Sequence, residues 1–137
     1  MSDTIGFMRE IANLQEQINA LRTIEVGGVW RDWTPIVLST VGTITSYTIQ
    51  MARYTRIGKV GVFHAQFTIT DNGTGSGAIQ LTLPFTAIGI QTFVGRASTY
   101  MLVGFTQSTV AIAIRYDNAY PGVTGAIFRV TGTVEIA

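Results

Sequence analysis

Few side chains in this sequence could carry out acid–base or metal chemistry. Beyond the first 28 residues the carboxylates are Asp32, Asp71, Asp117 and Glu135, and the single histidine is His64. None of these carboxylates falls in a recognisable acid–base motif, and one histidine cannot supply the histidine pairs of common zinc motifs. Cysteine is absent, which removes disulfides and thiolate chemistry. We therefore predict a protein that is not an enzyme and that holds no cofactor and no metal.

Two further features each allow a functional and a structural interpretation. His64 alternates with Phe63 and Ala65, so we interpret it as a polar strand residue at a subunit contact, with a lone ligand or base as the alternative. The stretch "DNGTGSG" (71–77) has the glycines of a phosphate loop, but no Lys-Ser/Thr follows them. It offers a calcium ion only the carboxylate of Asp71. A glycine-rich hairpin tip is the simpler interpretation.

Aromatic and polar side chains also gather in "RYDNAYPG" (115–122) and "WRDWTP" (30–35). The first stretch is a candidate surface for recognising a sugar or a protein, although turn chemistry also explains its Asp-Asn and Pro-Gly pairs. Its candidate residues are Arg115, Tyr116, Asp117, Asn118 and Tyr120. In the second stretch we interpret Trp30 and Trp33 as an aromatic plug where two parts of the chain meet. A stacking platform for a sugar is the alternative.

The first part of the chain predicts a helix over residues 4–24, roughly 30 Å long. Its apolar side chains follow a heptad pattern, with Ile11 and Ile18 at position a and Phe7, Leu14 and Leu21 at position d. Ser2 or Asp3 can cap its start, and Gly27-Gly28 suits its exit. The narrow stripe favours self-association over packing on the chain's own β domain. Since Ile at a with Leu at d favours a parallel dimer, the heptads alone do not establish a trimer.

The rest of the chain predicts strands, because apolar and polar residues alternate in it and no helical pattern intervenes. The expected strands are 43–54, 59–70, 78–85, 92–98, 100–107, 109–116 and 125–136. Strands at this spacing are typical of an antiparallel β-sandwich or jelly roll. We divide the chain into a helix with a Gly-Gly hinge (residues 1–28) and a β-sandwich head (residues 29–137).

The alternation also predicts which side chains share a face. The expected sets are Tyr47, Ile49 and Met51; Phe63, Ala65, Phe67 and Ile69; Ile79, Leu81 and Leu83; and Phe128, Val130, Val134 and Ile136. If subunits pack about a threefold axis, apolar faces beyond those of one core should lie there. Our candidates for that contact are Phe63, Phe67, Tyr100 and Phe105.

Composition limits the partners that we expect. Charged residues make up 12% of the chain, about half the usual share of about 25%, which suits an assembled β protein. The nine basic residues are scattered and the net charge is +1, so we expect no nucleic acid. No apolar run reaches the 18 or more residues of a membrane helix, so we expect no insertion into a membrane.

The order of these features resembles small trimeric fibre, spike and decoration proteins of phage and prophage virions. The resemblance rests on a heptad helix followed by "GGVWRDWTPIV" (27–37), and then by "YTIQMARYTRIGKVGVFHAQFTIT" (47–70) with a glycine turn and "LTLPF" (81–85). Its most specific pieces are Y-x-x-I-G-K-V (54–60) and L-P-F (83–85). By this resemblance, we expect Tyr54 and the turn at 57–59 to lead into a central strand, and Leu83-Pro84-Phe85 to end a strand. The chain lacks the long shaft, the chaperone segment and the His-x-His iron motif of some such proteins.

The resemblance implies a homotrimer on the surface of a phage particle. Its helix would trimerise or dock on other virion proteins, and its head would bind a glycan or protein of the host surface. A capsid decoration protein that clamps major capsid subunits is the near alternative. A secreted signalling ligand of the tumour-necrosis-factor or C1q type is less favoured, because the sequence begins without the basic and apolar regions of a signal peptide. A polysaccharide lyase or hydrolase built between subunits ranks last.

Overall fold

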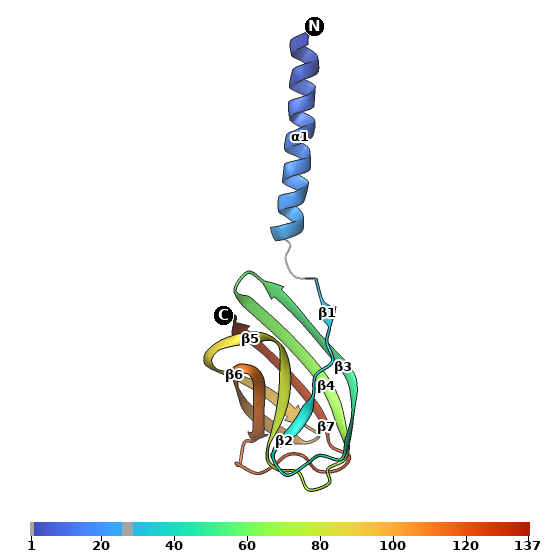
Figure 1. Cartoon of the computed structure of the whole chain (residues 1–137), viewed down its shortest axis with the longest axis vertical. Helices are drawn as coiled ribbons and strands as arrows, with labels where there is room; N and C mark the ends of the chain where they lie inside the picture. Colours follow the sequence, from blue (N-terminus) through green and yellow to red (C-terminus); the bar gives the residue numbers. More distant parts are fainter. Residues whose placement is uncertain (1, 26–28) are drawn as a thin grey trace.

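The computed structural model describes the backbone of residues 2–25 and 29–137 and the side chains of 4–19 and 29–137. Its elements are α1 (Ser2–Glu25), β1 (Arg31–Asp32), β2 (Val37–Val41), β3 (Ser46–Ile57), β4 (Val60–Asp71), β5 (Ser76–Ala97), β6 (Tyr100–Arg115) and β7 (Ile127–Glu135). The predicted mainly β fold with one N-terminal helix is confirmed, since strands make up more than half of the chain (Figure 1). The side chains of Ser2, Asp3 and Leu21 and the Gly27-Gly28 hinge lie outside the described part of the chain, and so do the predictions made for them.

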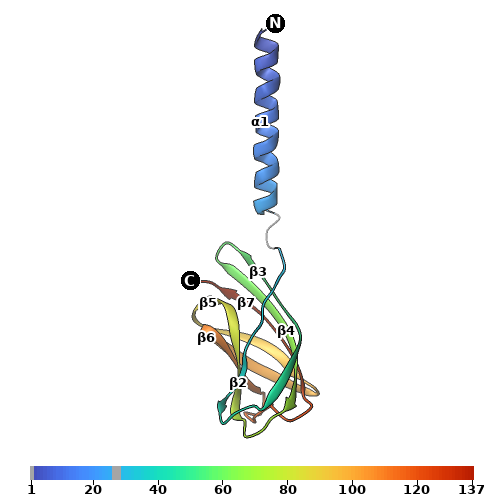
Figure 2. The same ribbon diagram turned by 45° about the vertical axis from the view of Figure 1, so that its right-hand side comes forward.

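Within the described residues the strands form one antiparallel sheet that curls on itself. Its order is β1-β3-β4-β7-β5-β2, and β6 also pairs with β5. The curl follows from the length of β5, whose two halves have different neighbours. The first half pairs with β2 and with the end of β6, where Leu81 faces both Val37 and Ala111. The second half pairs with β7 and the start of β6, where Val94 faces both Thr131 and Val103 (Figures 1 and 2).

Both β5 and β6 were expected as two separate strands, and both continue through a bend instead. The register between β5 and β6 shifts once on each side of the pair formed by Ala87 and Ser108. Ser108 adopts a φ of 54°. Such bulges bend a strand without ending it. The expectation that Leu83-Pro84-Phe85 ends a strand is therefore wrong, because these residues enter the bend. The turn before Val60 does lead into a central strand, since β4 lies between β3 and β7.

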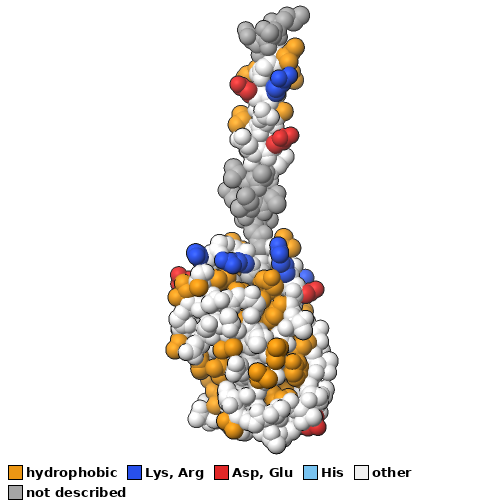
Figure 3. Space-filling view, in the orientation of Figure 1, with side chains coloured by type: hydrophobic (Ala, Val, Ile, Leu, Met, Phe, Trp, Pro, Cys, Tyr) orange, Lys and Arg blue, Asp and Glu red, His pale blue; other side chains and the backbone are white. Residues whose placement is uncertain are grey.

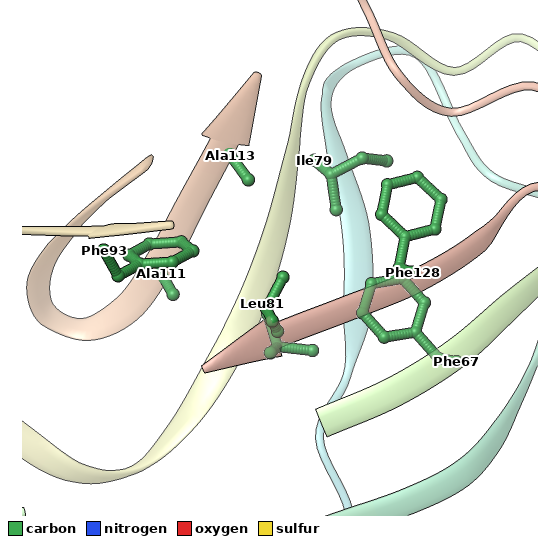
Figure 4. A pocket seen from close by; sticks show the side chains of 8 residues that line it. Phe67, Ile79, Leu81, Phe93, Ala111, Ala113 and Phe128 are labelled. Carbon is green, nitrogen blue, oxygen red and sulfur yellow. The ribbon is translucent and has the colours of Figure 1, made fainter. Parts of the chain in front are cut away.

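The core fills the inside of the curl with aromatic side chains from several strands. Phe67 and Phe128 stack with centroids 4.8 Å apart and planes 3° apart, while Phe63 meets Phe93 edge-on at 5.7 Å. Figure 4 shows Phe67 and Phe128 close together on the inner side of the ribbon. Gly132 makes room for this packing, because a Cβ there would lie 2.5 Å from the Phe63 ring.

The predicted inward faces of the strands 59–70, 78–85 and 125–136 are confirmed. All the members of these three sets are buried: Phe63, Ala65, Phe67, Ile69, Ile79, Leu81, Leu83, Phe128, Val130, Val134 and Ile136. For the same reason, the expectation that Phe63 and Phe67 contact a neighbouring subunit is wrong. These two side chains are 0% and 1% exposed and lie in the core of a single chain.

Candidate functional site

The apolar stripe of α1 is exposed along its described length. Phe7, Ile11, Leu14 and Ile18 have exposed fractions of 64%, 49%, 57% and 45%. All described side chains of the helix, residues 4–19, are exposed. Figure 3 shows hydrophobic side chains along the helix above the β domain. The alternative that the stripe packs on the chain's own β domain therefore does not hold for these residues.

A bulge in β3 turns one apolar residue away from the core. Ile49 pairs with Phe67 and Met51 pairs with Gln66, so Gln50 and Met51 together face a single residue of β4. Tyr47 and Ile49 pack against the core, as expected. Beyond the bulge the alternation is shifted by one, and Ala52 is buried while Met51 faces outward. The prediction that Met51 shares a face with Tyr47 and Ile49 is therefore wrong.

Met51 lines a groove on the outer face of the sheet. The groove has a volume of about 270 Å³ and is lined by Trp30, Met51, Arg53, His64 and Thr131. Arg53 pairs with His64 across β3 and β4, and His64 pairs with Thr131 across β4 and β7. Ladder partners project on the same side of a sheet, so these three side chains form a row across adjacent strands. We call this the Trp30 groove.

Polar groups in the Trp30 groove are held in place but retain free hydrogen-bonding capacity. The Arg53 Nε lies 3.7 Å from Asp32 Oδ1, and the two side chains are 49% and 90% exposed. Exposed pairs of this kind contribute little to stability. Among the described residues, none accepts a hydrogen bond from the Arg53 guanidinium. The Thr131 hydroxyl donates to the Phe63 carbonyl at 3.2 Å, which leaves its oxygen able to accept.

The two tryptophans have different environments. The Trp33 Nε1 donates to the carbonyl of Thr82 at 3.1 Å, and its ring meets Tyr54 edge-on at 6.1 Å. Trp33 therefore packs against the core of the β domain, and its role as a plug at the junction with the helix stays a prediction. Trp30 is 46% exposed and lines the groove, so its indole faces solvent.

The loop 115–122 uses much of its polar capacity internally. Arg115 forms an ion pair of 2.7 Å with Asp117, and its guanidinium carbon lies 3.6 Å from the centre of the Tyr100 ring. Asn118 has a φ of 65°, typical of asparagine in tight turns. Tyr116 is 67% exposed and faces solvent. Its role in recognition stays a prediction.

The stretch 71–77 forms the turn between β4 and β5, but these two strands do not pair with each other, so the hairpin interpretation is wrong. The Asp71 Oδ1 accepts a hydrogen bond from the Gly73 amide, and Asn72 accepts one from the Gly75 amide through its carbonyl. The Tyr120 hydroxyl donates to Asn72 Oδ1 at 2.7 Å and ties the loop 115–122 to this turn. Burial raises the pKa of Tyr120, and the Ser39 hydroxyl opposes that shift.

The remaining candidate contacts, Tyr100 and Phe105, lie on β6 with less burial than the core. Tyr100 is 40% exposed and Phe105 is half-buried. Their place in a subunit contact stays a prediction. Within the described ranges, no three His, Asp or Glu side chains gather as metal ligands would, and no helix is long and apolar enough to cross a membrane.

No protein family, curated protein or solved structure matches this chain. Its similarity to virion proteins therefore remains an expectation from the sequence. Sequence reasoning identified Trp30 and His64 but missed Met51, Arg53 and Thr131 as their neighbours. The shifted alternation in "QMARY" (50–54) was the available signal, since buried Ala52 and outward Arg53 reverse the order set by Tyr47 and Ile49.

Proposed function

We propose that this chain is a non-enzymatic structural subunit of a phage virion, a trimeric fibre or spike. Its helix forms the stem and contacts other virion proteins, and its β domain forms a jelly-roll-type head directed at the host surface. The observation that supports this proposal most is the exposed heptad stripe of α1. Four large apolar side chains on one face of a helix need a partner, and the described part of this chain supplies none.

Self-association supplies that partner, because a second copy of the same stripe can cover the first. Burying one such side chain fully contributes about 1.5–3 kcal/mol, so copies of the stripe stabilise one another in a coiled coil. Three heptads are short for an independent coiled coil, and the heads must therefore contribute contacts of their own. Phe105, on the outer face of β6, and the exposed Tyr100, on the opposite face at the start of the strand, are the candidates for this contact.

The first experiment is the absolute mass of the full chain in solution, by light scattering after size exclusion. We expect three chains per particle. The variant Ile18→Asp places a charge in the a/d seam and should raise the concentration at which the particle dissociates at least tenfold. Asn13→Asp adds the same charge at the outer c position and should leave the mass unchanged. Circular dichroism should show that the strands of both variants stay folded.

A single chain in the unmodified protein would contradict the proposal, as would an Ile18→Asp variant that assembles like its parent. The location is tested separately, by mass spectrometry of phage particles purified from a strain that carries the gene. We expect the chain in the particle fraction. If it is expressed but absent from particles, the virion role is wrong even where the trimer holds.

A further inference from the structure

We propose that the Trp30 groove binds one carboxylated pyranose ring, a single unit of an acidic glycan. This inference deepens the proposed function, because it names the ligand class that a displayed head would recognise. It relies on the lining of the groove by Trp30, Met51, Arg53, His64 and Thr131 and on the row that the last three form across β3, β4 and β7.

The size and the apolar part of the groove suit one sugar ring. A volume of about 270 Å³ lies just below the usual range of about 300–1,000 Å³ for sites that hold drug-sized ligands. The exposed indole of Trp30 offers a flat surface on which the C–H face of a pyranose can lie. The Met51 side chain, turned outward by the bulge, adds an adaptable apolar contact beside it.

The polar part of the groove suits a carboxylate with neighbouring hydroxyls. A guanidinium offers a planar set of N–H donors that matches a carboxylate in two parallel hydrogen bonds. The only acid near Arg53 in the described chain is Asp32, which is 3.7 Å away and 90% exposed, so a ligand can displace it at little cost. Ring hydroxyls can donate to Thr131 and exchange hydrogen bonds with His64.

The scaffold holds these groups in place before a ligand arrives. Arg53, His64 and Thr131 project from paired strands in the middle of the sheet, and Trp30 directly precedes β1, whose Asp32 pairs with Arg53. Bulges are frequent beside binding sites, where they redirect a side chain. The bulge at Gln50 has this effect on Met51. Sites on strands supported in this way bind with a small ordering cost.

The test is a titration of the full chain labelled with ¹³C at the methionine methyl groups. The chain has four methionines, and Met8 and Met101 lie outside the groove and serve as internal controls. Methyl β-D-glucuronide and methyl α-N-acetylneuraminate should each be tried, with methyl β-D-glucoside as the neutral control. We expect one or both acids to shift the Met51 signal alone, with a Kd at least about tenfold below that of the glucoside.

Matched variants separate the apolar and charged parts of the site. Trp30→Ala should weaken binding of the acid about tenfold or more, while Ile90→Ala, which trims an exposed apolar side chain outside the groove, should leave the Kd unchanged. Arg53→Gln should abolish the preference for the acid over the glucoside. Arg56→Gln removes the same charge from the same strand outside the groove and should preserve that preference.

The tighter of the two acids identifies the source, a uronate-containing or a sialylated glycan. An unmoved Met51 signal with both acids would overturn the proposal, and so would equal affinity for the neutral glucoside. Unchanged binding in Trp30→Ala would place the site elsewhere and would also overturn it. Light scattering on the same samples keeps these outcomes distinct from a failure of the trimer.

Discussion

At the scale of single residues, Tyr120 connects two loops that lie far apart in the sequence. Its hydroxyl donates to Asn72 Oδ1 at 2.7 Å, so the loop 115–122 is fixed to the turn that joins β4 and β5. Two glycines make this possible, because a Cβ at Gly75 or Gly122 would lie within 2.6 Å of the Tyr120 hydroxyl. The two tyrosines of this loop therefore differ. Tyr120 holds the loop to the neighbouring turn, whereas Tyr116 is exposed to solvent.

The environment of Tyr120 predicts a loss of stability in alkali. Burial raises the pKa of Tyr120 above its ordinary value of about 10, although the Ser39 hydroxyl opposes the shift. Above pH 10 the unfolded chain therefore loses the phenolic proton before the folded chain does. The stabilisation is complete below pH 10 and disappears as the pH rises through the folded-state pKa. Urea unfolding between pH 8 and 11 should show this decline.

Tyr120→Phe provides the control for that measurement. At pH 8 the variant should be less stable by about 1 kcal/mol, because Asn72 loses its donor. Between pH 10 and 11 its free energy of unfolding should decline less steeply than that of the parent, since the variant has no phenol at this position to titrate. Parallel declines in the two proteins would mean that other tyrosines or lysines govern the alkaline transition.

At the scale of elements, periodicity predicted the long central strands and failed where pairing is irregular. Phe63, Ala65, Phe67 and Ile69 alternate without interruption, because β4 pairs with β7 without a register shift and the bulge opposite Phe67 inserts its extra residue into β3. A bulge depends on how many residues face each other across two strands, which one strand's pattern does not contain. For this reason Met51 was assigned to the wrong face. β1 and β2 were missed because two and five residues are too few to display a period.

The bulge also gives a prediction about β3. Deleting Gln50 removes the extra residue and leaves Ile49 opposite Phe67 and Met51 opposite Gln66 in regular pairing. Both halves of β3 should therefore keep their register and their inward faces. We expect a loss below about 1 kcal/mol in the free energy of unfolding, measured with urea.

Gln50→Ala is the matched control for this deletion. It keeps the number of residues and removes only the exposed hydrogen bond of 2.8 Å from Gln50 Nε2 to the Thr68 hydroxyl. Its cost should stay below about 1 kcal/mol. If the deletion costs much more than Gln50→Ala, the register of β3 depends on the extra residue, and the account of the bulge is wrong.

At the scale of the whole molecule, the sequence predicted the helix and the β domain better than it predicted the contacts between segments of the chain. Local patterns of apolar and polar residues predicted the helix, its heptad stripe and the mainly β domain. The groove was not, because Trp30, Arg53, His64 and Thr131 come from four separate segments that only the curled sheet brings together. Phe63 and Phe67 show the same limit of prediction from sequence. An apolar strand face has the same residue pattern whether it covers the core of its own chain or contacts a neighbouring subunit.

A trimer makes one further prediction about thermal unfolding. Since assembled chains must separate when they unfold, mass action makes Tm depend on protein concentration. For a chain of this length, each tenfold rise in concentration should raise Tm by about 2–5 °C, measured by calorimetry. Ile18→Asp should remove this dependence if the stem holds the trimer together, whereas Asn13→Asp should retain it. A Tm that is independent of concentration in the parent would mean that the heads unfold as separate units, and the stem would then be the only contact between subunits.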